Sequence, residues 1–208
     1  AAPAASCDTV LAARQRLQPS LHGFRPLTVG ISTSEPVVEE VLRQSQGDWP
    51  GKLVICPTSL MASQLGAPAL DLGFDIAEDG IACRVRDENS QEVSIVRMLH
   101  GLGELLLDEH PHVDVIVSDH CLAQLSWTVQ RCGPGYLVVH PGGQTHESLL
   151  RTMRSIAAPL ATDGVGRFWV RRGALIVGDA LQTATLVLRS LSRSDRSMSQ
   201  WGRENPTP

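Results

Sequence analysis

The 208-residue sequence has no excess of positive charge, no CxxC pair and no long apolar run. Its formal net charge of −4 gives no reason to expect nucleic acid or an anionic membrane as the main partner. Five cysteines without CxxC spacing argue against a disulfide framework and against a ribbon-type zinc site, and they favour a reducing compartment. The first residues lack a basic segment followed by an apolar run, and no stretch approaches the roughly 18 apolar residues of a membrane span. We therefore expect a cytoplasmic protein with no nucleic-acid and no membrane partner.

The composition is that of a globular protein, with 42% hydrophobic and 19% charged residues. A chain of this length fits one α/β domain with a full core, and it shows no internal repeat and no linker. We predict a single domain over residues 1–208, with a core at about 9–191 and a flexible tail at 192–208. Trp201 is the residue of this tail that would anchor it to a neighbour.

Apolar periodicity divides the chain into alternating strands and helices. Asp79-Gly80 is a strong turn signal and predicts an antiparallel hairpin. Thr145 is a suitable N-cap for the helix that follows it. The predicted strands are 26–32, 53–56, 69–76, 81–85, 113–118, 136–140, 167–170 and 174–177. The predicted helices are 9–21, 36–44, 92–109, 122–130, 146–160 and the segment from 179 to 191.

The stretch Pro111–Cys121, PHVDVIVSDHC, organises this pattern. Its apolar residues predict a buried strand, and the strand is followed by Ser118, Asp119, His120 and Cys121. Side chains of these types bind metals and transfer protons. A functional site is therefore expected where this strand ends.

Three stretches resemble the class II aldolase/adducin family: 55–80, 110–126 and 167–188. The similarity extends from about Gly23 to Leu191. It implies an αβα fold of the α/β class, in which helices cover both faces of a central, mixed, largely antiparallel sheet. It also implies a homo-oligomer, or a hetero-oligomer with a related subunit, because this family builds its pockets between subunits.

The residues that carry this family's chemistry are largely replaced. The resemblance places the metal-binding His-x-His at Ser118–His120 and the third histidine at Arg172, so only His120 remains. Arginine does not ligate zinc. The family's acid/base glutamate falls near Leu99 or His100, and its phosphate-binding element is altered at 29–32. We therefore expect neither a metal nor a cofactor.

Two residues at the end of the central strand are the catalytic candidates. His120 is either a general acid/base or a hydrogen-bonded histidine of a pocket wall. On a strand, Ser118 shares its face with His120, which places a hydroxyl near a base. Asp119 and Cys121 would point to the opposite side.

Three further residues are candidates for substrate binding. Arg172 would hold a carboxylate or enolate at the position of the missing metal, or would form a surface or intersubunit salt bridge. His140 and His146 flank a Pro-Gly-Gly loop, across which they would either converge or lie in solvent.

These observations leave two functional hypotheses. The first is an assembly or partner-binding module of the aldolase fold that has lost its catalytic chemistry, a pseudoenzyme. The second is a metal-independent lyase or isomerase acting on a small anionic carbonyl or hydroxy acid, with His120 as acid/base and Arg172 as anion clamp.

Overall fold

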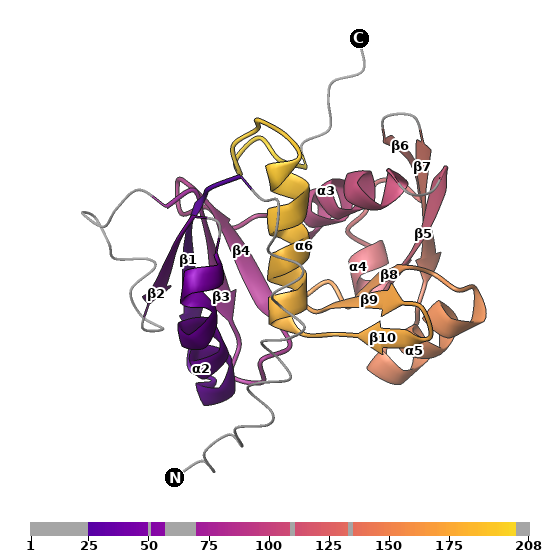
Figure 1. Cartoon of the computed structure of the whole chain (residues 1–208). Coiled ribbons are helices and arrows are strands. Elements are labelled where there is room, and N and C mark those ends of the chain that lie inside the picture. The colour runs from indigo at the N-terminus through magenta and orange to yellow at the C-terminus, as the bar shows by residue number, and fades with distance from the viewer. Residues whose placement is uncertain (1–24, 50, 57–69, 109–110, 133–134, 203–208) are drawn as a thin grey trace. The chain divides into compact units, whose positions relative to one another are not determined.

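A computed structural model describes residues 25–49, 51–56, 70–108, 111–132 and 135–202 (Figure 1). The chain divides into two compact units, each with its own sheet. Unit 1 comprises Ala1–Val93 with Ala180–Trp201, and unit 2 comprises Ser94–Asp179 with Gly202–Pro208. The single domain expected from the sequence stays a prediction. The predicted helix 9–21 lies outside the described residues.

Unit 1 contains a four-stranded sheet in the order β2-β1-β3-β4. Strand β1 is parallel to β2 and β3, while β3 and β4 form the antiparallel hairpin that Asp79-Gly80 predicted. Gly80 has a φ of +67°, which glycine adopts without strain. The elements of unit 1 are β1 (Thr28–Thr33), α2 (Pro36–Ser45), η1 (Gln46–Asp48), β2 (Lys52–Cys56), β3 (Leu72–Ile76), β4 (Cys83–Asp87) and α6 (Ala180–Ser192).

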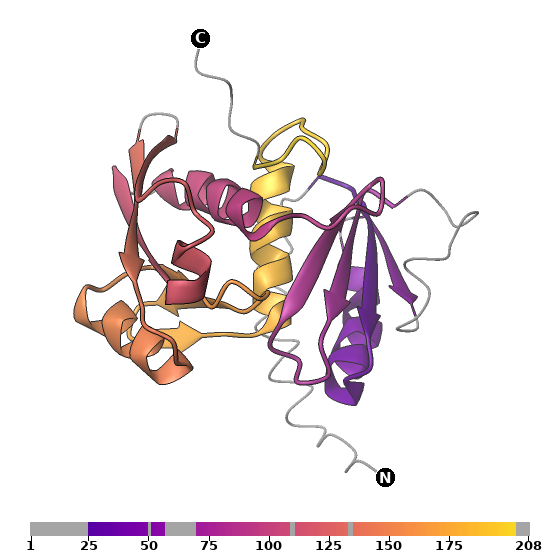
Figure 2. The same cartoon turned by 180° about the vertical axis from the view of Figure 1, so that it is seen from behind.

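Helix α2 forms where the sequence predicted a helix. The Glu35 carboxylate accepts the N–H of Val37, and Pro36 occupies the first turn, where its missing N–H costs nothing. Val38, Val41 and Leu42 recur at helical spacing and are buried. The helix covers one face of the four-stranded sheet, in front of it in Figure 1 and behind it in Figure 2.

The segment after α6 packs into unit 1. Trp201 is 1% exposed, and its indole N–H donates to the Ser190 hydroxyl at 2.9 Å. The Ser199 hydroxyl and backbone N–H both donate to the Glu88 carboxylate. Within the described residues, the predicted tail is therefore held by its own unit up to Trp201.

Unit 2 contains a six-stranded mixed sheet in the order β10-β9-β8-β5-β7-β6. Strand β5 lies in the interior, parallel to both of its neighbours β7 and β8, as its apolar sequence predicted for an inner strand. The three remaining pairs, β8·β9, β9·β10 and β6·β7, are antiparallel. The elements are α3 (Ile95–Leu107), β5 (His112–Val117), α4 (Asp119–Leu122), β6 (Val129–Cys132), β7 (Gly135–Pro141), α5 (His146–Ser155), β8 (Leu160–Thr162), β9 (Phe168–Arg172) and β10 (Leu175–Val177).

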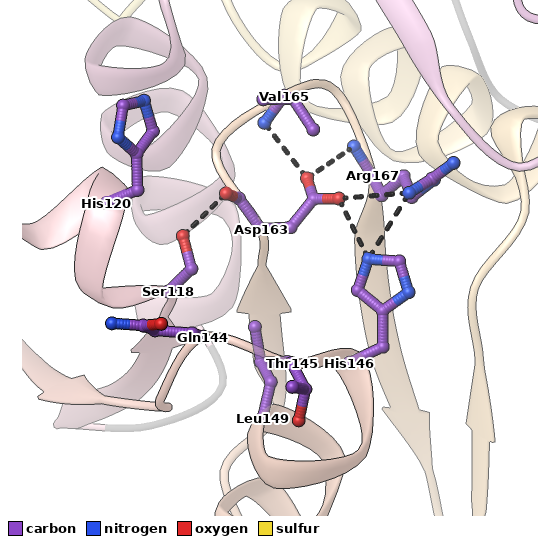
Figure 3. Close-up of a pocket in the computed structure, with 9 residues that line it drawn as sticks. All are labelled: Ser118, His120, Gln144, Thr145, His146, Leu149, Asp163, Val165 and Arg167. Atoms are coloured by element: carbon purple, nitrogen blue, oxygen red, sulfur yellow. Dashed lines mark hydrogen bonds and ion pairs between the residues drawn. The ribbon is translucent and has the colours of Figure 1, made fainter.

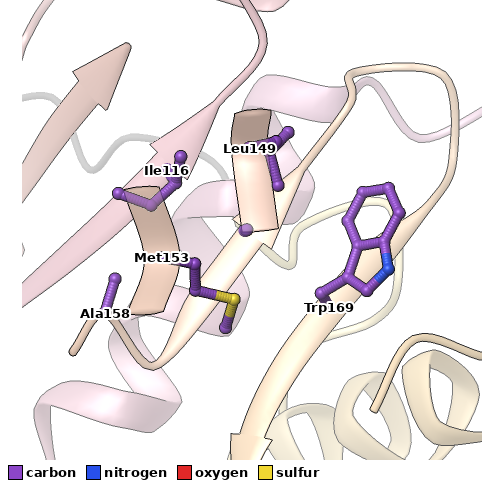
Figure 4. Packing of buried hydrophobic residues seen from close by; sticks show 6 residues of the cluster. Ile116, Leu149, Met153, Ala158 and Trp169 are labelled. Carbon is purple, nitrogen blue, oxygen red and sulfur yellow. The ribbon is translucent and has the colours of Figure 1, made fainter. Parts of the chain in front are cut away.

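Helices α3 and α5 pack on opposite faces of this sheet. Helix α3 approaches β7 so closely that a Cβ at Gly103 would meet the Leu137 side chain at 2.4 Å. On the other face, α5 contributes Leu149 and Met153 to a buried cluster with Ile116 and Trp169 (Figure 4). Burial of these apolar side chains fixes α5, and with it the residues at its N-terminus.

Two of the predicted helices differ from the structure: one is absent and the other is shorter than predicted. The segment 122–130 is not a helix: α4 ends at Leu122, and Val129–Cys132 forms the edge strand β6, because pairing with β7 satisfies its backbone. Helix α5 stops at Ser155 rather than at 160, because Ala157 adopts a φ of +59° and Pro159 cannot continue a helix.

The sheet arrangement predicted from the resemblance is wrong. Instead of one central, largely antiparallel sheet, the described residues form two mixed sheets, each with two parallel pairs. The coarser prediction, an α/β fold, is confirmed. No helix in the described part of the chain is long and apolar enough to cross a membrane.

Candidate functional site

A cavity of about 370 Å³ opens at the end of β5 in unit 2. It is bounded by the start of α4, the N-terminus of α5 and the loop between β8 and β9. The cavity therefore lies at the carboxyl edge of the parallel strands β5 and β8, where α/β sheets commonly bind ligands. Its lining residues, drawn in Figure 3, are Ser118, His120, Gln144, Thr145, His146, Leu149, Asp163, Val165 and Arg167.

Ser118 is the residue at which β5 gives way to α4. Its Oγ accepts the N–H of Cys121 at 3.2 Å, which makes Ser118 the N-cap of α4. The same hydroxyl donates its only proton to the carbonyl oxygen of Asp163 at 2.6 Å. Because this proton is committed to a buried carbonyl, Ser118 joins β5 to the β8–β9 loop and is not a ready nucleophile.

Asp163 shapes the loop that follows β8. Its Oδ1 accepts the backbone N–H groups of Val165 at 2.9 Å and Arg167 at 3.2 Å. Its Oδ2 lies 3.6 Å from the Arg167 guanidinium. A carboxylate that accepts backbone donors two and four residues ahead locks a tight loop. The loop holds the side chain of Val165, which is 61% exposed, at the edge of the cavity.

His146 completes a charged cluster with Asp163 and Arg167 (Figure 3). Its Nε2 lies 3.3 Å from Asp163 Oδ2 and 3.2 Å from Arg167 Nη1. The imidazole also packs against the Trp169 ring, with centroids 5.1 Å apart. Thr145 caps α5, and its hydroxyl accepts the N–H of Ser148, so the first turn that carries His146 is well formed.

His120 lies on α4 and not on a strand, which overturns the strand geometry expected for residues 118–121. Its imidazole points away from the Asp163 carboxylate in Figure 3. Its Nε2 lies 2.9 Å from the Gln124 amide nitrogen, one helical turn ahead. His120 therefore borders the cavity without joining the charged cluster.

The five candidate residues divide into two groups. Ser118, His120 and His146 line the cavity. His140 does not line it: its Nε2 lies 2.7 Å from Asp114 Oδ1, on the neighbouring strand. Arg172 is exposed at the end of β9 and does not line the cavity either. Their catalytic and binding roles stay predictions.

The sequence reasoning missed Asp163 and Arg167, which carry the charges of the cavity. The signal was the sequence Asp163-Gly-Val-Gly-Arg167, because an Asp followed by two alternating glycines is typical of a tight loop. Gly164 and Gly166 have φ values of +84° and +99°, as such a loop requires.

The Cys121 thiol lies behind this loop. Burial, and secondarily the negative charge of Asp163, raise the pKa of this thiol to about 11. Cys121 is therefore protonated at neutral pH and is no nucleophile. Among the described residues, no group of three or more His, Cys, Asp or Glu side chains is placed to hold a metal ion.

Comparisons with solved structures identify the fold. The chain aligns with a phosphoglucomutase/phosphomannomutase family protein from Burkholderia thailandensis at a TM-score of 0.68 and 17% identity, covering 88% of this chain and 44% of that one. It aligns with a phosphoglucomutase from Paramecium at a TM-score of 0.60 and 12% identity, covering 94% and 42%. For N-acetylphosphoglucosamine mutase of Aspergillus fumigatus the TM-score is 0.58 at 12% identity, covering 93% and 47%.

The fold of this chain matches part of these phosphohexomutase structures. The chain spans about half the length of these structures. No protein-family pattern matches the sequence, and no curated protein matches it either.

The phosphohexomutase fold overturns the aldolase resemblance. The class II aldolase/adducin assignment is wrong, and with it the assembly module or pseudoenzyme of that fold. The alternative, a lyase or isomerase with His120 as acid/base and Arg172 as anion-binding residue, rested on the same aldolase fold and is wrong for the same reason. The predicted oligomer rested on that resemblance and stays untested.

Proposed function

We propose that this chain binds a phosphorylated hexose in the cavity of unit 2. The proteins with this fold are named as mutases of glucose, mannose and N-acetylglucosamine phosphates. Sugar-phosphate binding is the part of that activity proposed for a chain that spans about half of their length.

The position of Arg167 is the observation that carries this proposal. Its guanidinium lies at the cavity wall and is held by Asp163, 3.6 Å away, and by His146, 3.2 Å away. A guanidinium presents several N–H donors in one plane and binds phosphate through two of them at once. A phosphate oxygen in the cavity would therefore find guanidinium N–H donors, with the Asp163 carboxylate beside them.

The remaining lining residues fit the sugar and the anion. The N-terminus of α5, with Thr145 and His146, faces the cavity, and the positive end of a helix dipole favours an anion. Gln144 offers an amide for sugar hydroxyl groups. Leu149 and Val165 provide apolar surface for the carbon face of the ring.

The test is a binding titration of the purified chain with glucose 1-phosphate, mannose 1-phosphate and N-acetylglucosamine 1-phosphate. Glucose and inorganic phosphate, the two halves of such a ligand, are titrated separately for comparison. We expect the sugar phosphates to bind more tightly than either half. Arg167→Gln should weaken this binding about 10- to 100-fold, the usual effect of losing a charged hydrogen bond.

Arg172→Gln is the matched control, because Arg172 is an arginine at the other end of β9, exposed and outside the cavity. It should bind like the unsubstituted chain. Urea unfolding of both variants checks that any loss arises in the cavity and not from unfolding. Equal binding by Arg167→Gln, or no binding of any sugar phosphate at millimolar concentration, would contradict the proposal.

A further inference from the structure

The Nε2 atom of His146 lies between a donor and an acceptor. Arg167 Nη1, which always carries hydrogen, is 3.2 Å away, and Asp163 Oδ2, which accepts, is 3.3 Å away. One ring nitrogen carries either a proton or a lone pair. His146 can therefore satisfy only one of these two neighbours at a time.

The two states of Nε2 give two different arrangements at the cavity wall: a lone pair, as in the neutral Nδ1–H tautomer, or a proton, as in the neutral Nε2–H tautomer and in the imidazolium. With a lone pair at Nε2, His146 accepts from Arg167 and the guanidinium is held against the imidazole. With a proton at Nε2, His146 donates to Asp163, and Arg167 Nη1 now faces another N–H. Asp163 Oδ2 stays 3.6 Å from Arg167 Nη1, so a phosphate oxygen in the cavity would give this donor a closer acceptor.

We propose that a sugar phosphate binds to this cavity together with one proton, which His146 takes up at its ring. This inference rests on the proposed sugar-phosphate binding. The phosphate oxygen accepts from Arg167, the proton from solvent enters the imidazole, and the Nε2–H of the imidazolium donates to Asp163. No covalent bond forms or breaks.

Charge balance gives the reason for the proton. Before binding, the charges of Asp163 and Arg167 cancel. A phosphate ester adds nearly two negative charges at neutral pH, and the carboxylate of Asp163 lies within the same cluster. A positive imidazolium 3.3 Å from Asp163 offsets this repulsion.

Of the groups that surround His146, Asp163 and Arg167 are the charged ones in contact with its Nε2 atom. The uncharged ring of Trp169, on β9, packs on the imidazole. From α4, His120 borders the cavity, and the Asp119 carboxylate accepts the N–H of Gly143. On α5 itself, the neighbouring glutamate and the arginine one turn later are paired at 2.7 Å, namely Glu147 and Arg151.

The test is calorimetry of glucose 1-phosphate binding at pH 7.5 in buffers with different heats of ionisation. The dependence of the measured heat on the buffer gives the number of protons taken up. We expect about 0.5–1 proton for the unsubstituted chain and a value near zero for His146→Gln. The affinity of the unsubstituted chain should also fall with rising pH, by at most about tenfold per pH unit for one proton.

His112→Gln is the control, because His112 is an exposed histidine on β5 outside the cavity. It should keep the proton uptake. The ligand is the same for all variants, so protonation of the phosphate itself cancels in the comparison. His146→Asn is a second variant without the imidazole. The urea midpoint of each variant shows whether the substitution impairs folding.

Equal proton uptake by the unsubstituted chain and both His146 variants would overturn the inference. Tight binding without proton uptake would overturn it too, while the proposed sugar-phosphate binding would stand. If no sugar phosphate binds, the proposed function fails and the proton linkage fails with it.

Discussion

The Ser118 hydroxyl donates a hydrogen bond of 2.6 Å to the backbone carbonyl of Asp163, 45 residues later in the chain. The bond joins the end of β5 to the loop that carries the charges of the cavity. The same Oγ caps α4 by accepting the N–H of Cys121. One buried side chain thus fixes two of the three segments that surround the cavity.

Ser118→Ala should therefore lower the stability and loosen the loop. Both the Asp163 carbonyl and the Cys121 N–H lose a buried partner, which costs about 1–3 kcal/mol. The measurement is urea unfolding, with amide hydrogen exchange of Val165 and Arg167 as the local readout. Ser155→Ala, an exposed serine that donates only to Thr152, is the control. Unchanged exchange in the loop would show that this hydrogen bond does not hold it.

Gly164 should tolerate alanine poorly. Its φ is +84°, and a Cβ would lie 2.6 Å from the Cβ of Cys121. Gly173, on the β9–β10 turn, has a similar φ of +60° but open space around it. Gly173→Ala should cost about 1–2 kcal/mol for the left-handed conformation alone. Gly164→Ala should cost about 1–3 kcal/mol more, because the buried contact adds overpacking. If thermal or urea unfolding shows the same loss of stability for both variants, the loop accommodates the Cβ at position 164 without an added cost in free energy.

The Glu88–Ser199 contact should make unit 1 sensitive to acid. Desolvation acts to raise the pKa of Glu88, but hydrogen bonds, first from the Ser199 side chain and then from backbone N–H groups and Ser197, outweigh it and lower the pKa. A lowered folded pKa means that the stabilisation is present above the ordinary value of 4.5 and is lost as the pH falls below it. Glu88→Gln should therefore destabilise the protein at pH 7 and make less difference near pH 3.

Urea unfolding monitored by Trp fluorescence at both pH values measures this difference. Glu78→Gln is the control, since Glu78 is an exposed carboxylate on the hairpin of the same unit. It should change the stability little at either pH. A Glu88→Gln effect that is independent of pH would contradict a role for the ionised carboxylate.

Cys121 should resist alkylation in the folded protein. Its thiol is buried, and its pKa is raised to about 11, so very little thiolate forms at pH 8. Iodoacetamide treatment at pH 8, followed by peptide mass spectrometry, should leave Cys121 unmodified. The same treatment in concentrated urea should modify it. Rapid labelling of the folded chain would indicate that the 163–167 loop opens readily.

Local signals in the sequence were sufficient for many of the individual elements. Asp79-Gly80 predicted the antiparallel hairpin, Thr145 predicted the start of α5, and the apolar run after His112 predicted an inner strand. These features depend on a turn residue, a cap or the periodicity of burial, all of which act between residues close in sequence.

Only the tertiary structure decided how these elements combine. The order and direction of the strands, the edge strand β6 and the end of β5 at Ser118 depend on backbone pairing between distant segments. Local propensity is too weak to specify such pairing. The pairing of His120 with Arg172 came from the aldolase resemblance, whereas the fold brings together His146, Asp163 and Arg167. His146 meets Asp163 and Arg167 across 17 and 21 residues, and no spacing rule along the chain predicts these contacts.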